Sequence, residues 1–164
     1  MNARVLTLLG ELEKSRAVLA RIVDFHDRYV ERTHLRERTT EQAIVIADIL
    51  SNYYTCLETM FLRISQFFEN ELASEKWHQD LLGKMTLRIE GIREPVISGT
   101  TEALLAELLR FRHFKRYYFE FEYDWDRIDF LRKKFEQVRP AINTDLDGFA
   151  EFLRTLAAHS QENG

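Results

Sequence analysis

The sequence has one cysteine, two prolines and six glycines among its 164 residues. Cys56 has no second cysteine to pair with, so an intrachain disulfide is excluded. Its place within an apolar run favours a buried small hydrophobe over a reactive thiol. Because proline and glycine are the residues that most often end a helix or strand, their scarcity leaves few forced breaks, and we expect long regular elements.

The sequence also has no apolar run long enough to cross a membrane. Glu11, Glu13 and Lys14 follow the N-terminus before any apolar stretch reaches the length of a signal peptide. We therefore expect a cytoplasmic protein without membrane association. The 23 Lys and Arg residues are outnumbered by 27 Asp and Glu residues, and the net charge of -4 gives no overall attraction to nucleic acid. Any such binding must come from a local cluster.

Apolar residues recur at steps of three and four along most of the chain, which is typical of helices. The first helix is expected over about residues 3–32, with Ser15 and His26 as the polar positions on its apolar stripe, and we interpret His26 as a satisfied core or interface histidine. A second helix should begin after Thr39, which can form a capping box with Gln42. This helix carries two apolar stripes: Ala43, Ala47, Leu50, Tyr54, Leu57, Phe61, Ile64 and Phe68, and Ile46, Ile49, Tyr53, Cys56, Met60 and Phe67.

Two adjacent stripes on one helix imply neighbours on two sides, so the second helix should be central. Its apolar surface also exceeds what a small bundle needs to bury within one chain, which predicts a homodimer. A shorter helix is expected after Ser74, ending near Gly91. The stretch from Gly91 to Gly99 should be a loop, because Pro95 disfavours a helical conformation at the residue before it.

Two further helical segments complete the pattern. Thr100 or Thr101 can cap a segment that runs to about Phe121, and Asp124 can cap the last one. Pro140 predicts a kink or a short break at residue 139, and residues 160–164 should be frayed. The sequence therefore predicts an all-α, long-helix bundle of four to five helices, forming a single domain over residues 1–164.

Residues 110–118 read Arg-Phe-Arg-His-Phe-Lys-Arg-Tyr-Tyr, a basic and aromatic cluster within an acidic protein. Helical spacing places Arg112 beside Arg116, and His113 beside Tyr117. Two such arginines can hold a phosphate, and nearby aromatic rings can stack on a base. The alternative is a solvated basic face, balanced by the acidic residues just downstream. Those carboxylates lie where the next helix begins and suit its N-terminus, so no metal site is expected.

The sequence resembles the HepT-like branch of the HEPN proteins from about residue 47 onward. This family contains the toxins of toxin-antitoxin modules whose partners are minimal nucleotidyltransferases. The resemblance rests on Tyr53-Tyr54 with Glu58, on Trp77-His78 followed by Leu81-Leu82 and Met85, on Arg93 to Ser98, on Leu109 to Phe114, and on Asp124-Trp125.

The resemblance implies a helical bundle that dimerises around a shared cleft, where active members cut RNA without a metal or other cofactor. The family motif is Arg, four residues, His, one residue, Tyr. Arg112 matches its first position, but Tyr117 replaces the histidine and Phe119 replaces the tyrosine. A phenol is a poor general base at neutral pH, and Phe119 lacks the hydroxyl that looks like the acceptor for nucleotide transfer from the antitoxin.

Three hypotheses follow from the sequence. In the first, the chain is a toxin-related protein with impaired or residual metal-independent ribonuclease activity. In the second, it is a catalytically inactive dimer that binds a nucleotide, RNA or a protein partner. In the third, it is a purely structural helical dimer. The candidate catalytic residues are Arg112, Tyr117 and, as a displaced base, His113. The candidate binding residues are Arg110, Lys115, Arg116, Tyr118 and His78.

Overall fold

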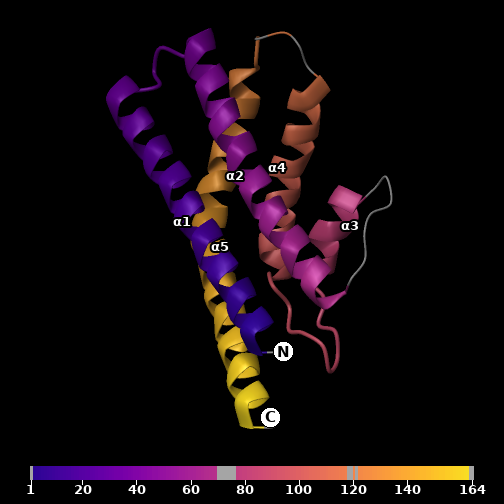
Figure 1. The fold of residues 1–164 in the computed structure, drawn as a ribbon. Helices are drawn as coiled ribbons and strands as arrows, with labels where there is room; N and C mark the ends of the chain where they lie inside the picture. The colour runs from indigo at the N-terminus through magenta and orange to yellow at the C-terminus, as the bar shows by residue number, and fades with distance from the viewer. Residues whose placement is uncertain (1, 70–76, 118–119, 121, 163–164) are drawn as a thin grey trace.

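A computed structural model of the protein describes residues 2–69, 77–117, 120 and 122–162, without the side chains of residues 2, 77–79 and 160–162. The described residues form five helices: α1 (Asn2–Thr33), α2 (Thr40–Phe68), α3 (Trp77–Lys84), α4 (Gly99–Tyr117) and α5 (Trp125–Glu162). The four long helices run alongside one another, and short α3 lies beside α2 and α4 (Figure 1). No β-strand occurs in this part of the chain, so the prediction of an all-α bundle is confirmed.

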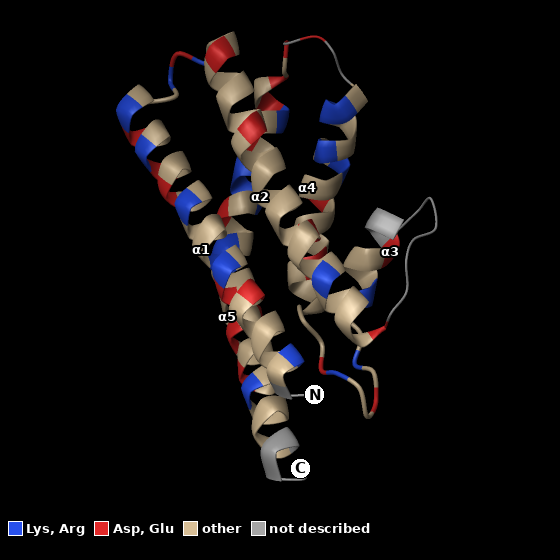
Figure 2. Ribbon diagram, viewed as in Figure 1, with Lys and Arg blue, Asp and Glu red and all other residues tan. Residues whose placement is uncertain are grey.

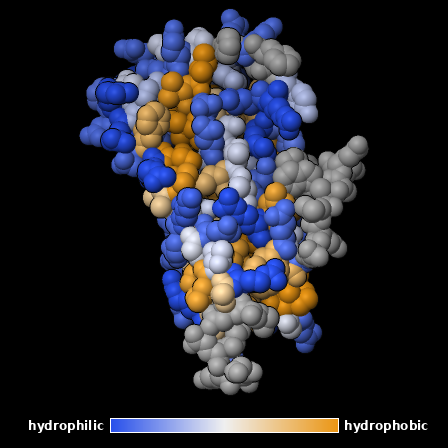
Figure 3. All heavy atoms as spheres, in the orientation of Figure 1, coloured by the Kyte–Doolittle hydropathy of each residue, from blue (hydrophilic) through white to orange (hydrophobic). Residues whose placement is uncertain are grey.

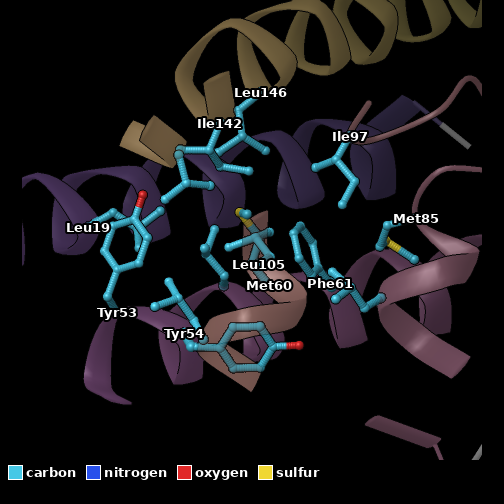
Figure 4. Packing of buried hydrophobic residues seen from close by; sticks show 14 of the residues in the cluster. Leu19, Tyr53, Tyr54, Met60, Phe61, Met85, Ile97, Leu105, Ile142 and Leu146 are labelled. Atoms are coloured by element: carbon cyan, nitrogen blue, oxygen red, sulfur yellow. The ribbon is translucent and has the colours of Figure 1, made fainter. Parts of the chain in front are cut away.

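Helix α2 is central because it packs against every other described helix. Most residues of its two apolar stripes are fully buried, among them Tyr53, Tyr54, Met60 and Phe61 (Figure 4). Cys56, Phe67 and Phe68 are half-buried against the core. The predicted capping box is present: Thr39 Oγ1 accepts a hydrogen bond from Gln42 N at 3.2 Å, and Thr39 N donates to Gln42 Oε1 at 3.4 Å. Such a cap contributes about 1 kcal/mol.

Helix α5 runs from Trp125 to Glu162 without interruption, so of the predicted kink or short break at residue 139 the break is wrong. Proline removes one backbone N–H and crowds one turn, but Val138 and Ile142 on either side of it are fully buried, which keeps the chain helical through this turn. Asp124 is the predicted cap, since its Oδ1 accepts from Asp126 N at 3.0 Å. The helix also continues to Glu162, into the segment expected to be frayed.

Two predicted boundaries on the α3–α4 side are wrong. Helix α3 ends at Lys84 rather than near Gly91, and Ser98 rather than Thr100 or Thr101 caps α4. Ser98 Oγ accepts from Thr101 N at 3.2 Å, while Thr101 is buried against α5 and donates its hydroxyl to Asp145. The Thr101 hydroxyl therefore donates to a neighbouring helix instead of capping α4. The predicted end of α4 near Phe121 lies outside the described residues.

The side chain of Arg93 explains why the chain turns after Lys84. Arg93 is 0 % exposed, and its five N–H groups have acceptors. Nε and Nη2 donate to Glu69 Oε1 at 2.9 and 2.6 Å, and the remaining bonds reach the backbone oxygens of Lys84, Leu87 and Glu94. One buried guanidinium thus joins the end of α2 to the loop that leads into α4.

Within the described ranges, no helix has the combination of length and hydropathy needed to span a membrane.

Candidate functional site

The last turns of α4 carry most of its basic residues, which Figure 2 shows as blue ribbon near the end of the helix. Three cationic side chains, a histidine and a serine line a cavity of about 210 Å³, which we call the cationic cavity: Arg112, His113, Lys115 and Arg116 from α4, and Ser51 from α2. The structure therefore brings four of the predicted site residues to one place. A cavity of this composition suits a small anion.

Arg112 is held by a carboxylate from α2. Its Nη1 donates to Glu58 Oε1 at 2.8 Å and to Glu58 Oε2 at 2.9 Å. Glu58 is buried, and Arg112 retains part of its exposure. Both bonds use Nη1, and a guanidinium carries three more N–H groups on Nε and Nη2 that can meet a phosphate. The pair fixes the orientation of Arg112 and offsets part of its charge.

Glu58 was not among the candidate site residues, although it belongs to the pattern on which the resemblance rests. A signal for its role was present in the sequence. Glu58 lies between Tyr54 and Phe61 beside an apolar stripe of the helix, and a carboxylate that is buried there needs a cationic partner. Burial, helped by the charge of Glu58, raises the pKa of Tyr54, so that phenol stays protonated.

The other cations of the cavity differ in their contacts. Lys115 Nζ lies 3.1 Å from Asp48 Oδ1 on α2. The Cζ atom of Arg116 lies 6.0 Å from the centroid of the Tyr117 ring. Tyr117, which takes the place of the motif histidine, is 72 % exposed and lies one turn beyond His113. His113 lines the cavity, whereas Tyr117 lies outside its lining.

The remaining candidates are not placed in the cavity. Arg110 is exposed, forms an ion pair with Glu107, and does not line the cavity. The backbone of His78 lies in α3, but its side chain is not described. Tyr118 and Phe119 lie outside the described residues. Cys56 is half-buried, and burial raises the pKa of its thiol, which favours the small-hydrophobe interpretation.

A second titratable cluster lies between α1 and α5. His26 Nδ1 lies 2.9 Å from Asp27 Oδ1 and 4.0 Å from Glu136 Oε1, and its ring packs edge-on against Phe135. The two carboxylates are already bound by Arg139 at 2.7–3.0 Å, so a cation occupies the position that a metal would need. Burial lowers the pKa of His26, which keeps the imidazole neutral at pH 7. His26 is thus a core histidine, but its Nε2 has no hydrogen-bond partner among the described residues.

Comparison with known families identifies the chain. A sequence model described as "HepT-like protein" matches residues 45–153, which is more than half of the sequence. The chain belongs to the HepT-like family. The match runs from early α2 to late α5, so it includes every residue that lines the cationic cavity and leaves out all of α1. Neither the curated proteins nor the solved structures gave a match.

Proposed function

We propose that this HepT-like protein is toxin-related and binds RNA through a phosphate held in the cationic cavity, with impaired, residual metal-independent ribonuclease activity. The observation that carries the proposal is the convergence of Arg112, Lys115 and Arg116 with His113 around one small cavity. Arginine pairs bind phosphate by charge-assisted hydrogen bonds, and the protein as a whole, with a net charge of -4, offers no other general attraction to RNA.

The proposed impairment of RNA cleavage follows from the replacement of the motif histidine by Tyr117. In metal-independent RNA cleavage a general base takes the proton of the ribose hydroxyl, and a cationic group stabilises the charge on the phosphate. A phenol is a poor general base at neutral pH, so a tyrosine in place of the motif histidine impairs this proton transfer. Among the side chains that the structure describes, His113 is the histidine that lines the cavity, and we propose it as the displaced base that supports the residual cleavage.

A second candidate function is binding without cleavage, and the bond between Glu58 and Arg112 favours it. Because Glu58 offsets part of the charge of Arg112, this arginine can stabilise less of the charge that develops on a reacting phosphate. Incubating the purified protein with RNA in the presence of a chelator separates the two: cleavage that His113→Asn abolishes supports the residual nuclease, and intact RNA supports the binding protein.

We also propose that the protein acts in the cytoplasm, without a cofactor, and beside a minimal nucleotidyltransferase as its antitoxin. The family membership supports this context. Because Phe119 lacks a hydroxyl, nucleotide transfer to that position is excluded, and Tyr117 or Tyr118 would have to accept it. A neighbouring gene for a minimal nucleotidyltransferase, and co-purification of its product with this protein, would support the pair.

We further propose a homodimer, but on a different surface from the one the sequence suggested. Most of the two stripes of α2 is covered within the chain, so the stripes alone leave little apolar surface for a partner. An apolar groove of about 520 Å³ instead lies between α1 and α2, within the apolar patch that Figure 3 shows on this face. Its lining is Val18, Arg21, Ile22, Phe25, Ile44, Val45, Asp48, Ile49 and Asn52.

A second copy of the chain fits this groove for two reasons. In a two-fold dimer the same patch meets itself, so Arg21 of each copy can pair with Asp48 of the other. The groove also adjoins the cationic cavity, since Asp48 and Asn52 of the groove flank Ser51 of the cavity on α2. Dimerisation there would bring the two cavities close together.

At micromolar concentration we expect light scattering to give twice the 19.5 kDa mass of the chain. Val45→Glu, which puts a charge into the groove, should give the monomer. Leu6→Glu is the control, because Leu6 is an apolar α1 residue that is 50% exposed outside the groove. A monomeric parent, or a Val45→Glu variant that remains dimeric, would contradict this interface.

Phosphate binding can be tested by removing the cavity's charges in pairs. Arg116→Ala combined with Lys115→Ala should weaken binding of a short RNA strand, because two charge-assisted contacts, each worth about 1.5–3 kcal/mol, are lost. Arg110→Ala combined with Arg154→Ala removes the same charge from positions outside the cavity and should change affinity little. Fluorescence anisotropy measures both. Equal losses in the two variants would show that only net charge matters.

A further inference from the structure

The surface beyond the cationic cavity carries exposed aromatic rings that are covered by arginines. Tyr117 is 72% exposed, with the guanidinium of Arg116 at 6.0 Å from its ring centroid. Phe114 is 43% exposed, with the guanidinium of Arg127 from α5 at 5.8 Å from its ring. Residues three apart are neighbours on a helix surface, so Phe114 and Tyr117 occupy neighbouring positions on α4.

A single exposed aromatic residue is common and needs no function. What distinguishes Tyr117 is its connection to the cavity, because Arg116 both lines the cavity and lies over the Tyr117 ring. His113, on the cavity wall, lies four residues before Tyr117 on α4, a rise of about 6 Å. A phosphate bound by Arg116 therefore has a flat, exposed ring within reach of the nucleoside attached to it.

On the basis of the proposed function, we propose that Arg116 and Tyr117 form a stacking platform for an unpaired base, so that the site selects single-stranded RNA. Arg116 holds the phosphate, and the base beside that phosphate stacks on the Tyr117 ring. Aromatic rings and guanidinium planes stack on bases of any sequence, whereas the bases of a duplex are already stacked on each other. At Tyr117 the acid-base position of the family motif has thus become a base-binding position.

The test compares three ligands: a short oligoadenylate RNA, the same strand annealed to its complement, and a strand of equal length without bases. Tyr117→Leu should weaken binding of the single strand roughly 5- to 150-fold, the loss of one base–aromatic stack. Binding of the abasic strand should not change, and Tyr117→Phe should keep the affinity of the parent. Phe130→Leu is the matched control, because Phe130 is an exposed ring beneath Lys134 that does not line the cavity.

Two results would overturn the platform while leaving the phosphate site intact. An equal loss for the single strand and the abasic strand would mean that Tyr117 contacts the backbone. An unchanged affinity in Tyr117→Leu would mean that no base reaches the ring. A different result would contradict the proposed function itself. This result is an abasic strand that binds the variant with alanine at both Arg116 and Lys115 as tightly as it binds the parent chain. Circular dichroism of each variant confirms that the helices are retained.

Discussion

Tyr117→His is expected to raise metal-independent RNA cleavage by about 100- to 10,000-fold over the parent chain, the usual contribution of a positioned general acid or base. The substitution places an imidazole at the histidine position of the family motif, one turn from His113 and beside Arg116. An imidazole titrates near neutral pH, so the new activity should follow a histidine-like pH profile in the presence of a chelator. The same substitution should weaken base stacking.

Two controls separate this gain from a general effect of an added histidine. Phe130→His introduces an imidazole at an exposed position outside the cavity and should give no cleavage. Adding Arg112→Met and Glu58→Gln together should abolish the gain, since the phosphate loses its stabiliser while no unpaired carboxylate is left buried. If Tyr117→His is folded and binds RNA but does not cut it, binding without cleavage becomes the better account.

Arg93→Met should cost about 3–5 kcal/mol of the free energy of unfolding, because it leaves the carboxylate of Glu69 without its buried partner. The backbone oxygens of Lys84, Leu87 and Glu94 also lose the hydrogen bonds that Arg93 donates. Urea unfolding followed by circular dichroism measures the change.

Arg88→Met is the matched control, since Arg88 is 71% exposed and its ion pair with Glu94 lies at the surface. Exposed pairs contribute about 0–1 kcal/mol, so this variant should remain close to the parent. Adding Glu69→Gln to Arg93→Met should recover part of the lost free energy of unfolding, because the negative charge that Arg93 neutralises is removed. A loss in Arg93→Met no larger than that in Arg88→Met would show that Arg93 does not hold the loop.

The elements that could be predicted are those that local sequence determines. The helical stripes and the capping box of Thr39 and Gln42 involve residues within one or two turns, and the structure reproduces them. The wrong boundaries depend on distant partners. Thr101 is a good cap by residue type, but Asp145 on α5 takes its hydroxyl, and the loop after Lys84 is turned by Arg93 and its partner Glu69. At Pro140, burial of neighbouring residues overrides the usual effect of proline.

The same distinction holds for the candidate site. Arg112, His113, Lys115 and Arg116 are adjacent in sequence on one helix, so their convergence follows from helical geometry alone. Ser51 and Glu58 come from α2, and Glu58 is 54 residues from the arginine that it binds. No spacing rule connects residues so far apart. The sequence could therefore indicate a cluster of cations, but not that one of them is held by a buried carboxylate.

The most direct test of phosphate binding in the cationic cavity is the salt dependence of affinity for a short single-stranded RNA. We expect the logarithm of the association constant to fall linearly with the logarithm of salt concentration, and the slope to become shallower by about 0.7 for each phosphate contact removed. Arg116→Ala should therefore reduce both the affinity and the slope, while Arg110→Ala, at an exposed position paired with Glu107, should leave both close to those of the parent. Equal slopes and affinities in the parent and Arg116→Ala would contradict the proposal that this cavity holds the phosphate.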